Sequence, residues 1–314
     1  MSSLLKLSNV SVSYKNQVAV DSVSLEIPTT SYTLGIVGES GSGKTTLGLS
    51  IINLVEPPGR ITSGKIEFMG KDVLSMSETE LLSYRGEQVS MVYQSAMNAL
   101  NPVKRVASHV EEVLRVHGHE SKSEARDRAK ELLENLGIKK SRANDYPHQL
   151  SGGMRQRVVI AMALALSPKL LIADEPTSAL DVVVQRQILS LIKKQVLQKN
   201  LSLFFITHEL AILGGLVEYV AVMFQGEVVE YGELRKVLFE PLHPYTEMLV
   251  NSILTLASGP DALLASPRTA AEIAKNGGCK YAGICKYAFE RCRKERPKLL
   301  ESEGKRLVAC HKYN

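Results

Sequence analysis

The fold is decided by an eight-residue stretch, Gly38-Glu39-Ser40-Gly41-Ser42-Gly43-Lys44-Thr45. It follows a short apolar run, 34–37, and opens a helical pattern that extends to about residue 54. The spacing Gly-x4-Gly-Lys-Thr is typical of a phosphate-binding loop, in which glycines let backbone amides surround a phosphate group. Lys44 would reach the β- and γ-phosphates, and the Thr45 hydroxyl would bind Mg²⁺. A chance glycine-rich turn is the alternative, but the strand–loop–helix context favours a nucleoside triphosphate site.

The composition is that of an ordinary globular protein. The chain has 314 residues, of which 44% are apolar and 23% charged. These values allow a sizeable core and exclude a disordered, collagen-like or disulfide-stapled small protein. No apolar run approaches the roughly 18 residues that a membrane span needs, and the first ten residues lack a signal-peptide pattern. We therefore expect a cytosolic protein.

The net charge of +5 is unevenly distributed along the chain. The last forty residues, 275–314, contain 11 Lys/Arg and 4 Asp/Glu, a local net charge of +7, whereas the rest of the chain has a net charge of −2. A basic tail could indicate a nucleic acid or an anionic membrane as partner. Its few aromatic residues do not alternate with basic ones in a base-stacking pattern, so we expect no nucleic-acid partner.

Hydropathy periodicity predicts an α/β core with a helical insertion. Two alternating segments, 4–13 and 18–27, indicate strands that flank a turn at 15–17. The region 103–166 is almost wholly helical in pattern, and its clearest helix begins at the capping box Ser121-x-x-Glu124. Further strands are predicted at 64–68, 88–93, 169–173, 202–206, 218–224 and 227–231.

Two further segments contain residues that could bind phosphate or Mg²⁺ or activate water. An apolar strand ends in two carboxylates, of which Asp174 could hold Mg²⁺ through water and Glu175 could polarise an attacking water as general base. Residues 150–157, Leu-Ser-Gly-Gly-Met-Arg-Gln-Arg, precede an apolar helix. Ser151 could be an ordinary helix cap there, or the segment could form a second phosphate-binding helix terminus. It lies too far along the chain to complete the first site by local geometry.

In this order the segments resemble the nucleotide-binding subunit of ATP-binding cassette (ABC) transporters. The resemblance covers about 240 residues and adds a glutamine loop at Gln94, Ser178-Ala179-Leu180-Asp181, and the switch Thr207-His208-Glu209. It implies a P-loop NTPase fold of the ABC type, with an antiparallel β subdomain, a RecA-like core and an inserted helical subdomain. The implied boundaries are 1–245 for the nucleotide-binding domain, about 95–165 for the helical subdomain, and 246–314 for a C-terminal extension that binds a metal.

The resemblance also implies roles for individual residues. Tyr14 would stack on adenine, although a lone tyrosine at a strand end more often packs or lies at a rim. His208 would sense the γ-phosphate and support Glu175, although a lone histidine after a strand is more often a core or cap residue. His243 and the remaining histidines are expected to be structural. Contacts to ATP are expected from Gly38, Glu39, Ser40, Gly41, Ser42, Gly43, Lys44, Thr45 and Thr46, with Mg²⁺ at Thr45, Gln94 and Asp174.

One chain alone would not complete a site. In the family, two subunits pack head to tail, so that the phosphate loop of one faces the signature segment of the other, residues 150–157 in this chain, across ATP. The ATP of a partner subunit would therefore be contacted by Leu150, Ser151, Gly152, Gly153 and Asp181 of this chain.

The tail contains all four cysteines of the chain: Cys279, Cys285, Cys292 and Cys310. A disulfide is disfavoured in a cytosolic chain. Structural zinc sites with four cysteines usually have two closely spaced pairs, and wider spacing also suits an iron–sulfur cluster, so the residues alone leave both open. Together with 241–246 and 146–149, the tail resembles the C-terminal region of dipeptide/oligopeptide permease ATPases, which implies a 4Fe-4S cluster. Lys286 stands where that family commonly has proline.

The resemblance predicts an ATPase subunit that powers an importer of the peptide/oligopeptide class, with ATP, Mg²⁺ and a 4Fe-4S cluster (zinc as alternative). The expected partners are a second ATPase subunit, a paralogue, with two transmembrane permease subunits and an extracellular solute-binding protein. The expected location is peripheral, on the cytoplasmic face of the membrane. Import of oligosaccharides or nickel is an alternative, as is a soluble ATPase that acts on nucleic acid or ribosomes. Ser95-Ala96 replaces the family's usual acidic residue and proline after Gln94, which weakens transfer of a substrate from relatives.

Overall fold

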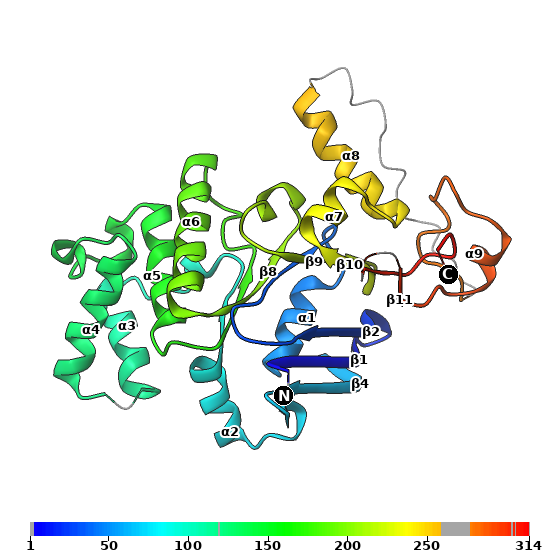
Figure 1. Ribbon diagram of the computed structural model, residues 1–314. Helices are drawn as coiled ribbons and strands as arrows, with labels where there is room; N and C mark the ends of the chain where they lie inside the picture. The colour runs from blue at the N-terminus through cyan, green and yellow to red at the C-terminus, as the bar shows by residue number, and fades with distance from the viewer. Residues whose placement is uncertain (1–2, 119, 259–276, 303, 305, 314) are drawn as a thin grey trace.

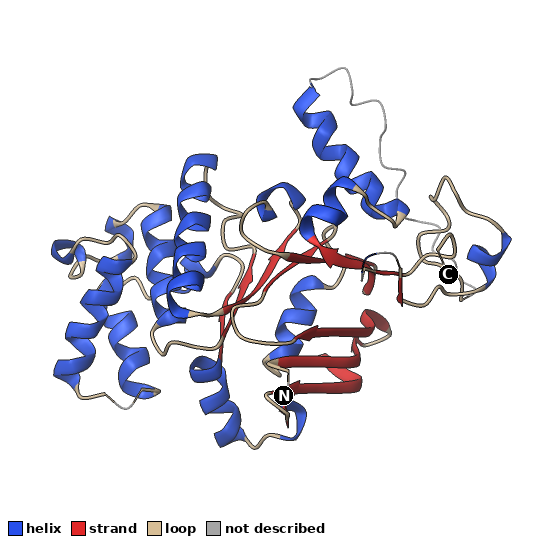
Figure 2. Ribbon diagram, in the orientation of Figure 1, coloured by secondary structure: helices blue, strands red, loops and turns tan. Residues whose placement is uncertain are grey.

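The structure is a computed structural model that describes residues 3–118, 120–258, 277–302, 304 and 306–313. A mixed sheet lies at its centre and a smaller antiparallel sheet lies beside it (Figures 1 and 2). Helices α3 and α4 occupy one end of the molecule, and the segment that contains α9 and the chain terminus occupies the opposite end (Figure 1).

The central sheet has the strand order β11-β12-β10-β9-β3-β8-β7-β6. The strands from β9 to β6 run parallel, whereas β10, β12 and β11 pair antiparallel. The bounds are β3 Thr33–Val37, β6 Val89–Val92, β7 Leu170–Asp174, β8 Ser202–Thr207, β9 Tyr219–Phe224, β10 Glu227–Glu233, β11 Leu300–Glu301 and β12 Leu307–Val308. The predicted strands of this sheet are confirmed, but the short β11 and β12 were not predicted.

The smaller sheet contains the two predicted N-terminal strands, which are also confirmed. Its order is β2-β1-β4-β5, and every pairing is antiparallel. The bounds are β1 Leu5–Tyr14, β2 Gln17–Ile27, β4 Gly59–Phe68 and β5 Lys71–Asp72. Strand β4 begins at Gly59 rather than at the predicted residue 64, because its exposed first half lacks a clear apolar alternation.

Helices cover the sheets and fill the region between β6 and β7. The capping box at Ser121 and Glu124 is present and starts α4, as predicted. The helices are α1 Lys44–Ile51, α2 Glu78–Ser83, α3 Val106–Val116, α4 Lys122–Asn135, α5 Gly152–Leu164, α6 Val182–Lys199, α7 Leu234–Phe239, α8 Pro244–Ser258 and α9 Glu290–Lys294. Short 3₁₀ turns lie at Val73–Ser75, Ala96–Ala99, Lys140–Arg142, Pro147–Gln149 and Leu210–Leu213, and a π turn lies at Tyr84–Gln88.

Alternation along the buried strands divides the core into two layers. In β8, Leu203 and Phe205 pack with the helices α3 to α6, whereas Phe204 and Ile206 pack with the small sheet and α1. All six residues of β8 are buried, as expected for a parallel strand that is covered on both faces. The loops at the carboxyl ends of the parallel strands are thereby held on a rigid base, where ligands bind in open α/β sheets.

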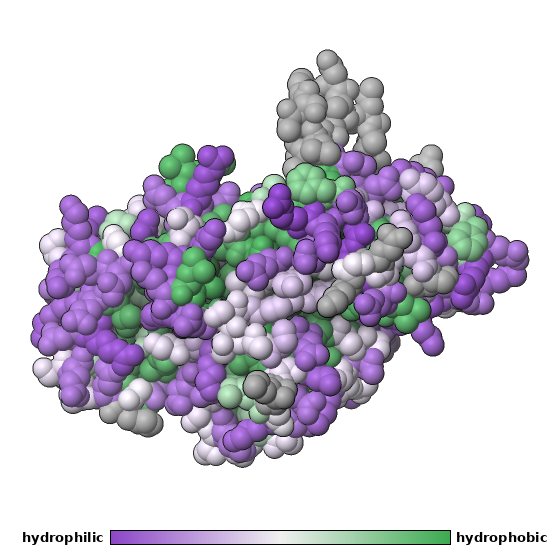
Figure 3. Space-filling model, viewed as in Figure 1, coloured by the Kyte–Doolittle hydropathy of each residue, from purple (hydrophilic) through white to green (hydrophobic). Residues whose placement is uncertain are grey.

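No helix in the described part of the chain is long and apolar enough to cross a membrane. The face of the molecule in Figure 3 is mostly polar, with apolar residues in small separate areas.

Candidate nucleotide site

The phosphate loop connects β3 to α1, as predicted, and two of its glycines are required by space. A Cβ on Gly38 would lie 2.1 Å from the backbone oxygen of Met223, and a Cβ on Gly43 would lie 2.2 Å from that of Ala19. Gly41 and Gly43 also have φ values of 81° and 96°, in the left-handed region that favours glycine. At Gly38 and Gly43 the loop is therefore packed directly against neighbouring backbone.

Lys44 lies inside the loop at the start of α1. It is 5% exposed, and its Nζ donates hydrogen bonds to the carbonyl oxygens of Gly38 (2.8 Å) and Glu39 (2.7 Å). Burial lowers the pKa of Lys44, and the nearby carboxylates Glu175 and Asp174 oppose that shift. The ammonium group is thus poised at the centre of the loop, where a phosphate could replace its carbonyl partners.

Asp174 ends β7 beside the loop and is 1% exposed. Burial is the largest influence on its pKa, which it raises to about 6, although a hydrogen bond from Thr45 and the charge of Lys44 lower it. Its Oδ1 has no hydrogen-bond partner in the described part of the chain. A buried carboxylate oxygen without a partner, next to a threonine hydroxyl, is suited to a hard cation such as Mg²⁺.

Glu175 is held between two other predicted residues, Gln94 and His208. Its Oε1 lies 2.8 Å from Nδ1 of His208, and its Oε2 accepts a hydrogen bond of 3.0 Å from Nε2 of Gln94. Its φ of 43° is unusual for a residue other than glycine, and its amide donates to Ile206 O in the adjacent strand. The structure thus brings together three residues that lie far apart in the sequence, with a carboxylate at their centre.

The signature segment starts α5, and Asp181 starts α6. Ser151 accepts a hydrogen bond from the Met154 amide, so it caps α5 as the simpler interpretation has it. A Cβ on Gly153 would lie 2.4 Å from Val184 Cγ1, which shows how closely α5 and α6 approach. Asp181 accepts hydrogen bonds from the amides of Val183 and Val184. Helices α5 and α6 lie on the side of α3 and α4, whereas the phosphate loop opens α1 (Figure 1).

Tyr14, at the end of β1, has its ring close to Gly59: a Cβ on Gly59 would lie 2.5 Å from Cε1 of Tyr14. The ring packs against the apolar layer of the small sheet. Stacking on adenine stays a prediction for this residue. His243 is buried, and burial lowers the pKa of its imidazole to about 3.

The four cysteines line one cavity together with His311 and Tyr281. Backbone amides two residues further on donate to three of the sulfurs: that of Tyr281 to Cys279, that of Tyr287 to Cys285 and that of Lys312 to Cys310. Burial raises the pKa of Cys279 to about 11. In the described part of the chain no group of three or more His, Cys, Asp or Glu side chains is placed to hold a single metal ion.

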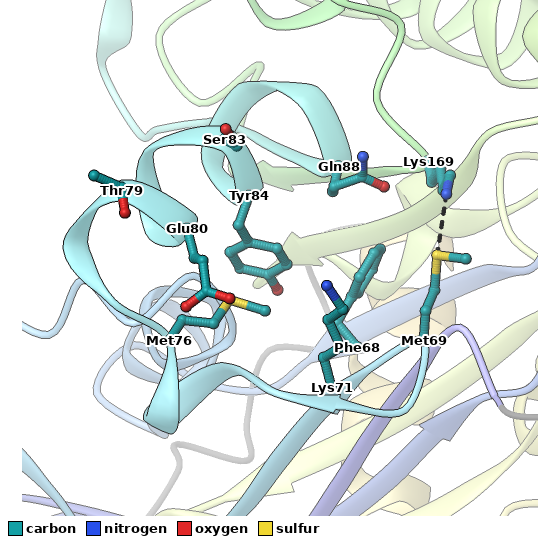
Figure 4. A pocket seen from close by; sticks show the side chains of 10 residues that line it. All are labelled: Phe68, Met69, Lys71, Met76, Thr79, Glu80, Ser83, Tyr84, Gln88 and Lys169. Carbon is teal, nitrogen blue, oxygen red and sulfur yellow. Dashed lines mark hydrogen bonds between the residues drawn. The ribbon is translucent and has the colours of Figure 1, made fainter.

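A separate pocket of about 540 Å³ lies between α2, the β4–β5 hairpin and Lys169 (Figure 4). Its wall is partly apolar, with Phe68, Met76 and Tyr84, and Lys169 Nζ lies 3.1 Å from Met69 Sδ at its edge. None of the residues predicted to bind nucleotide lines it. No pattern in the sequence predicts this pocket.

A contact to the phosphate loop was also missed. The Glu39 amide donates a hydrogen bond of 2.9 Å to the hydroxyl of Tyr245, at the start of α8. The family resemblance of residues 241–246 does not predict this contact, because an aromatic residue indicates burial without indicating its partner.

The fold and this site define a P-loop nucleotide-binding protein. Residues 20–178 match the model of the ABC transporter family, and residues 229–292 match that of the oligopeptide/dipeptide transporter C-terminal region. The chain belongs to the ABC transporter family, among the ATP-binding proteins of its oligopeptide and dipeptide branch.

Curated relatives agree with this assignment over the whole chain. The chain is 42% identical over 323 residues to the oligopeptide transport ATP-binding protein AppD of Bacillus subtilis, with 100% of this chain and 98% of AppD covered. It is 40% identical over 315 residues to the dipeptide transport ATP-binding protein DppD of Escherichia coli, with 98% and 96% covered. The solved ATP-binding cassette MJ0796, bound to ADP and phosphate, matches with a TM-score of 0.65 and 32% identity and covers 74% of this chain and 99% of its own. The expected ABC-type P-loop fold is confirmed.

Proposed function

We propose that this chain hydrolyses ATP to power the import of peptides through a membrane permease. The observation that carries the proposal is the arrangement of Glu175, whose carboxylate is fixed by Gln94 and His208 next to the phosphate loop. A carboxylate in this position can orient and deprotonate a water molecule, which is the chemistry that hydrolysis of a γ-phosphate needs. The relatives that span the chain are transport ATP-binding proteins for oligopeptides and dipeptides.

The hydrolysis follows from these positions. Lys44 leaves its carbonyl partners in the loop and pairs with the β- and γ-phosphates. A water molecule attacks the γ-phosphorus, the bond to the β-phosphate oxygen breaks, and Glu175 accepts the proton of the water. His208 holds Glu175 in the orientation that this transfer needs. The products are ADP and inorganic phosphate.

Mg²⁺ fits the residues present. Thr45, Asp174 and Gln94 supply hydroxyl, carboxylate and amide oxygens, the ligand types that Mg²⁺ prefers, and Oδ1 of Asp174 has no hydrogen-bond partner in the described part of the chain. Bound there, Mg²⁺ would offset the negative charge of the phosphates. It would also keep Asp174 ionised, despite the burial that raises its pKa.

A second ATPase subunit completes the site in this proposal. Leu150, Ser151, Gly152, Gly153 and Asp181 would face the ATP of that partner, as expected from the sequence. Next to Asp181, Val182 and Val183 are 63% and 65% exposed, which is unusual for valines at a helix start and suits a covered surface. The solved cassette MJ0796 is described as dimeric.

The remaining partners are two transmembrane permease subunits and an extracellular solute-binding protein, with this chain peripheral on the cytoplasmic face. Val103, in the loop after Gln94, is 80% exposed and suits a contact with a permease. We retain the proposed division into a domain of residues 1–245, with a helical subdomain at about 95–165, and an extension of 246–314. The second unit packs on the first, because β12 pairs with β10.

We also propose that the four cysteines bind a 4Fe-4S cluster. Their common cavity and the amide–sulfur hydrogen bonds are the donor set and surroundings that such clusters require. Zinc is the alternative occupant, because four thiolates suit either group. Anaerobic purification should give coloured protein with iron and sulfide, whereas colourless protein with stoichiometric zinc would overturn the assignment.

The catalytic proposal is tested with Glu175→Gln. The variant should bind ATP as the wild type does, and its turnover should fall by about 10²- to 10⁴-fold, the usual contribution of a general base. Glu209→Gln is the matched control, because this exposed carboxylate also lies near His208, with Oε1 3.7 Å from Nε2. Unchanged steady-state hydrolysis in Glu175→Gln would remove the residue from this role. Reconstitution with the permease subunits and peptide then tests the substrate class.

A further inference from the structure

Tyr245 touches the phosphate loop from the far end of the sequence. It is the second residue of α8 and is fully buried, and its hydroxyl accepts the hydrogen bond from the Glu39 amide. The Glu39 carbonyl, in turn, accepts hydrogen bonds from the Ser42 amide and from Lys44 Nζ. The hydroxyl of Tyr245 therefore holds the amide of Glu39, whose carbonyl is the acceptor for both the end of the turn at Ser42 and the loop lysine.

The ring of Tyr245 is held by two other aromatic rings. Its centroid lies 4.6 Å from that of Phe224, at the end of β9, and 5.6 Å from that of Tyr281. Tyr281 also packs edge-on against Phe224, with centroids 5.3 Å apart. Tyr281 lies between Cys279 and Cys285 in the C-terminal segment, residues 277–302. This segment therefore forms one wall of the position that the Tyr245 ring occupies.

The start of α8 is also fixed by β10, and the ring of His243 there lies 5.6 Å from the ring of Tyr281, centroid to centroid. Glu230 is fully buried and accepts hydrogen bonds from the amides of Leu242 (3.0 Å) and His243 (2.9 Å). The Tyr245 amide donates to Nδ1 of His243 at 3.0 Å. The backbone of Tyr245 is thus anchored to β10, and the direction of its ring is left to Phe224 and Tyr281.

The C-terminal segment holds the other side of the loop as well. Lys280 pairs with Asp21 of β2 at 2.8 Å and with Glu227 of β10 at 2.9 Å, and it donates a hydrogen bond of 2.9 Å to the Gln225 carbonyl in the turn between β9 and β10. In that turn, the Gly226 amide donates to the Ser42 carbonyl at 2.9 Å. Two adjacent residues of the segment therefore lie near the two ends of the Glu39–Ser42 turn. Tyr281 packs on Tyr245, which contacts Glu39, and Lys280 forms its ion pairs beside Gly226, which contacts Ser42.

We propose that Tyr245 is a positioning residue for the phosphate loop, and that the C-terminal segment around Tyr281 sets the affinity for ATP through it. The inference rests on the proposed nucleotide site. When the hydroxyl is present, the loop stays in the conformation that receives phosphate. When it is removed, the loop populates other conformations, and the apparent affinity falls in proportion to the population that remains competent.

Tyr245→Phe tests the first part, because it removes one hydroxyl and keeps the ring. A single hydrogen bond contributes about 0.5–1.5 kcal/mol, so ATP should bind about 2- to 10-fold more weakly, with kcat at saturating ATP changed less than two-fold. Amide exchange in the peptide that contains Glu39 should accelerate. Tyr84→Phe is the matched control, because it removes another buried hydroxyl with one backbone partner, Ile51 O, and should leave ATP affinity unchanged.

Tyr281→Leu tests the second part. It removes the supporting ring and should weaken ATP binding by a similar factor, and it should add little to Tyr245→Phe because both act on one contact. Tyr281→Phe, which keeps the ring, should bind ATP as the wild type does. Wild-type affinity and exchange in Tyr245→Phe would overturn the proposal, as would fully additive losses in the double variant. Lys44→Ala separates the two proposals: if it binds ATP as well as the wild type, the nucleotide site itself is misplaced.

Discussion

The pH dependence of stability at Asp174 is a quantitative test of the site, because burial of this carboxylate disfavours its ionised form. In the absence of metal and nucleotide, burial raises its pKa from 3.8 to about 6, and the hydrogen bond from Thr45 only partly opposes this. The folded protein therefore binds this proton more tightly than the unfolded chain does. Stability from this group is fully present below about pH 3.8 and is lost as the pH rises through about 6.

The size of the effect follows from the shift. A change from 3.8 to about 6 corresponds to about 3 kcal/mol of stability lost at neutral pH. Asp174→Asn removes this pH-dependent penalty. It also introduces a buried amide group at a site where Oδ1 of Asp174 has no hydrogen-bond partner in the described part of the chain. The unpaired amide should cost about 1–3 kcal/mol of stability, independently of pH. The free energy of unfolding of the variant, relative to the wild type, should therefore rise by about 1.5 kcal/mol between about pH 5 and about pH 7.5.

The measurement is urea unfolding in EDTA without nucleotide, at several pH values. Circular dichroism is the suitable signal, since the chain contains no tryptophan. Asp181→Asn serves as control for the loss of a carboxylate, because Asp181 is an exposed helix cap and asparagine caps equally well. A difference that stays constant or falls with pH would refute the reasoning. With Mg²⁺ and ATP the wild type should gain stability that the variant lacks, since ligand binding stabilises the folded state.

Three substitutions test the backbone of the site. Gly38→Ala places a Cβ 2.1 Å from a backbone carbonyl, so unfolding measurements should show a loss of at least about 1–3 kcal/mol, together with loss of ATP binding. Gly153→Ala should destabilise through its clash with Val184 Cγ1, and the added change Val184→Ala should recover part of the loss in the same assay. Because φ is 43° at Glu175, glycine there should be more stable than alanine by about 1 kcal/mol in urea unfolding. At the exposed helical Glu131, alanine should be more stable than glycine.

The local parts of the site could be predicted from the sequence. A strand, a glycine-rich turn and a helix follow one another at 33–51, although the atoms that exclude a Cβ at Gly38 and Gly43 belong to other strands, at Met223 and Ala19. The carboxylates Asp174 and Glu175 are likewise placed by one buried strand. Signals of this kind depend on spacing and periodicity, which are properties of adjacent residues.

The contacts between distant segments could not be predicted in the same way. Lys280 and Arg296 belong to the basic tail, whose charge the sequence presented as an excess, yet both pair with Asp21 and Glu227 of the nucleotide-binding region. A net charge says nothing about which carboxylate a lysine will reach. Strand β12 has only two residues, too few for periodicity to be visible, and it still joins the tail to β10.

The placement of Glu175 depends both on its own strand and on side chains from distant segments. Its position is fixed by the backbone, because its amide continues the hydrogen bonding of β7 with β8 through Ile206 O. Its orientation is fixed by side chains from two other segments, Gln94 and His208. A shift of the loop that carries Gln94 would therefore turn the carboxylate without moving its α-carbon. The connection between β6 and α3 that carries Gln94 also presents the exposed Val103, so one hydrogen bond links this surface segment to a carboxylate whose left-handed φ restricts its backbone.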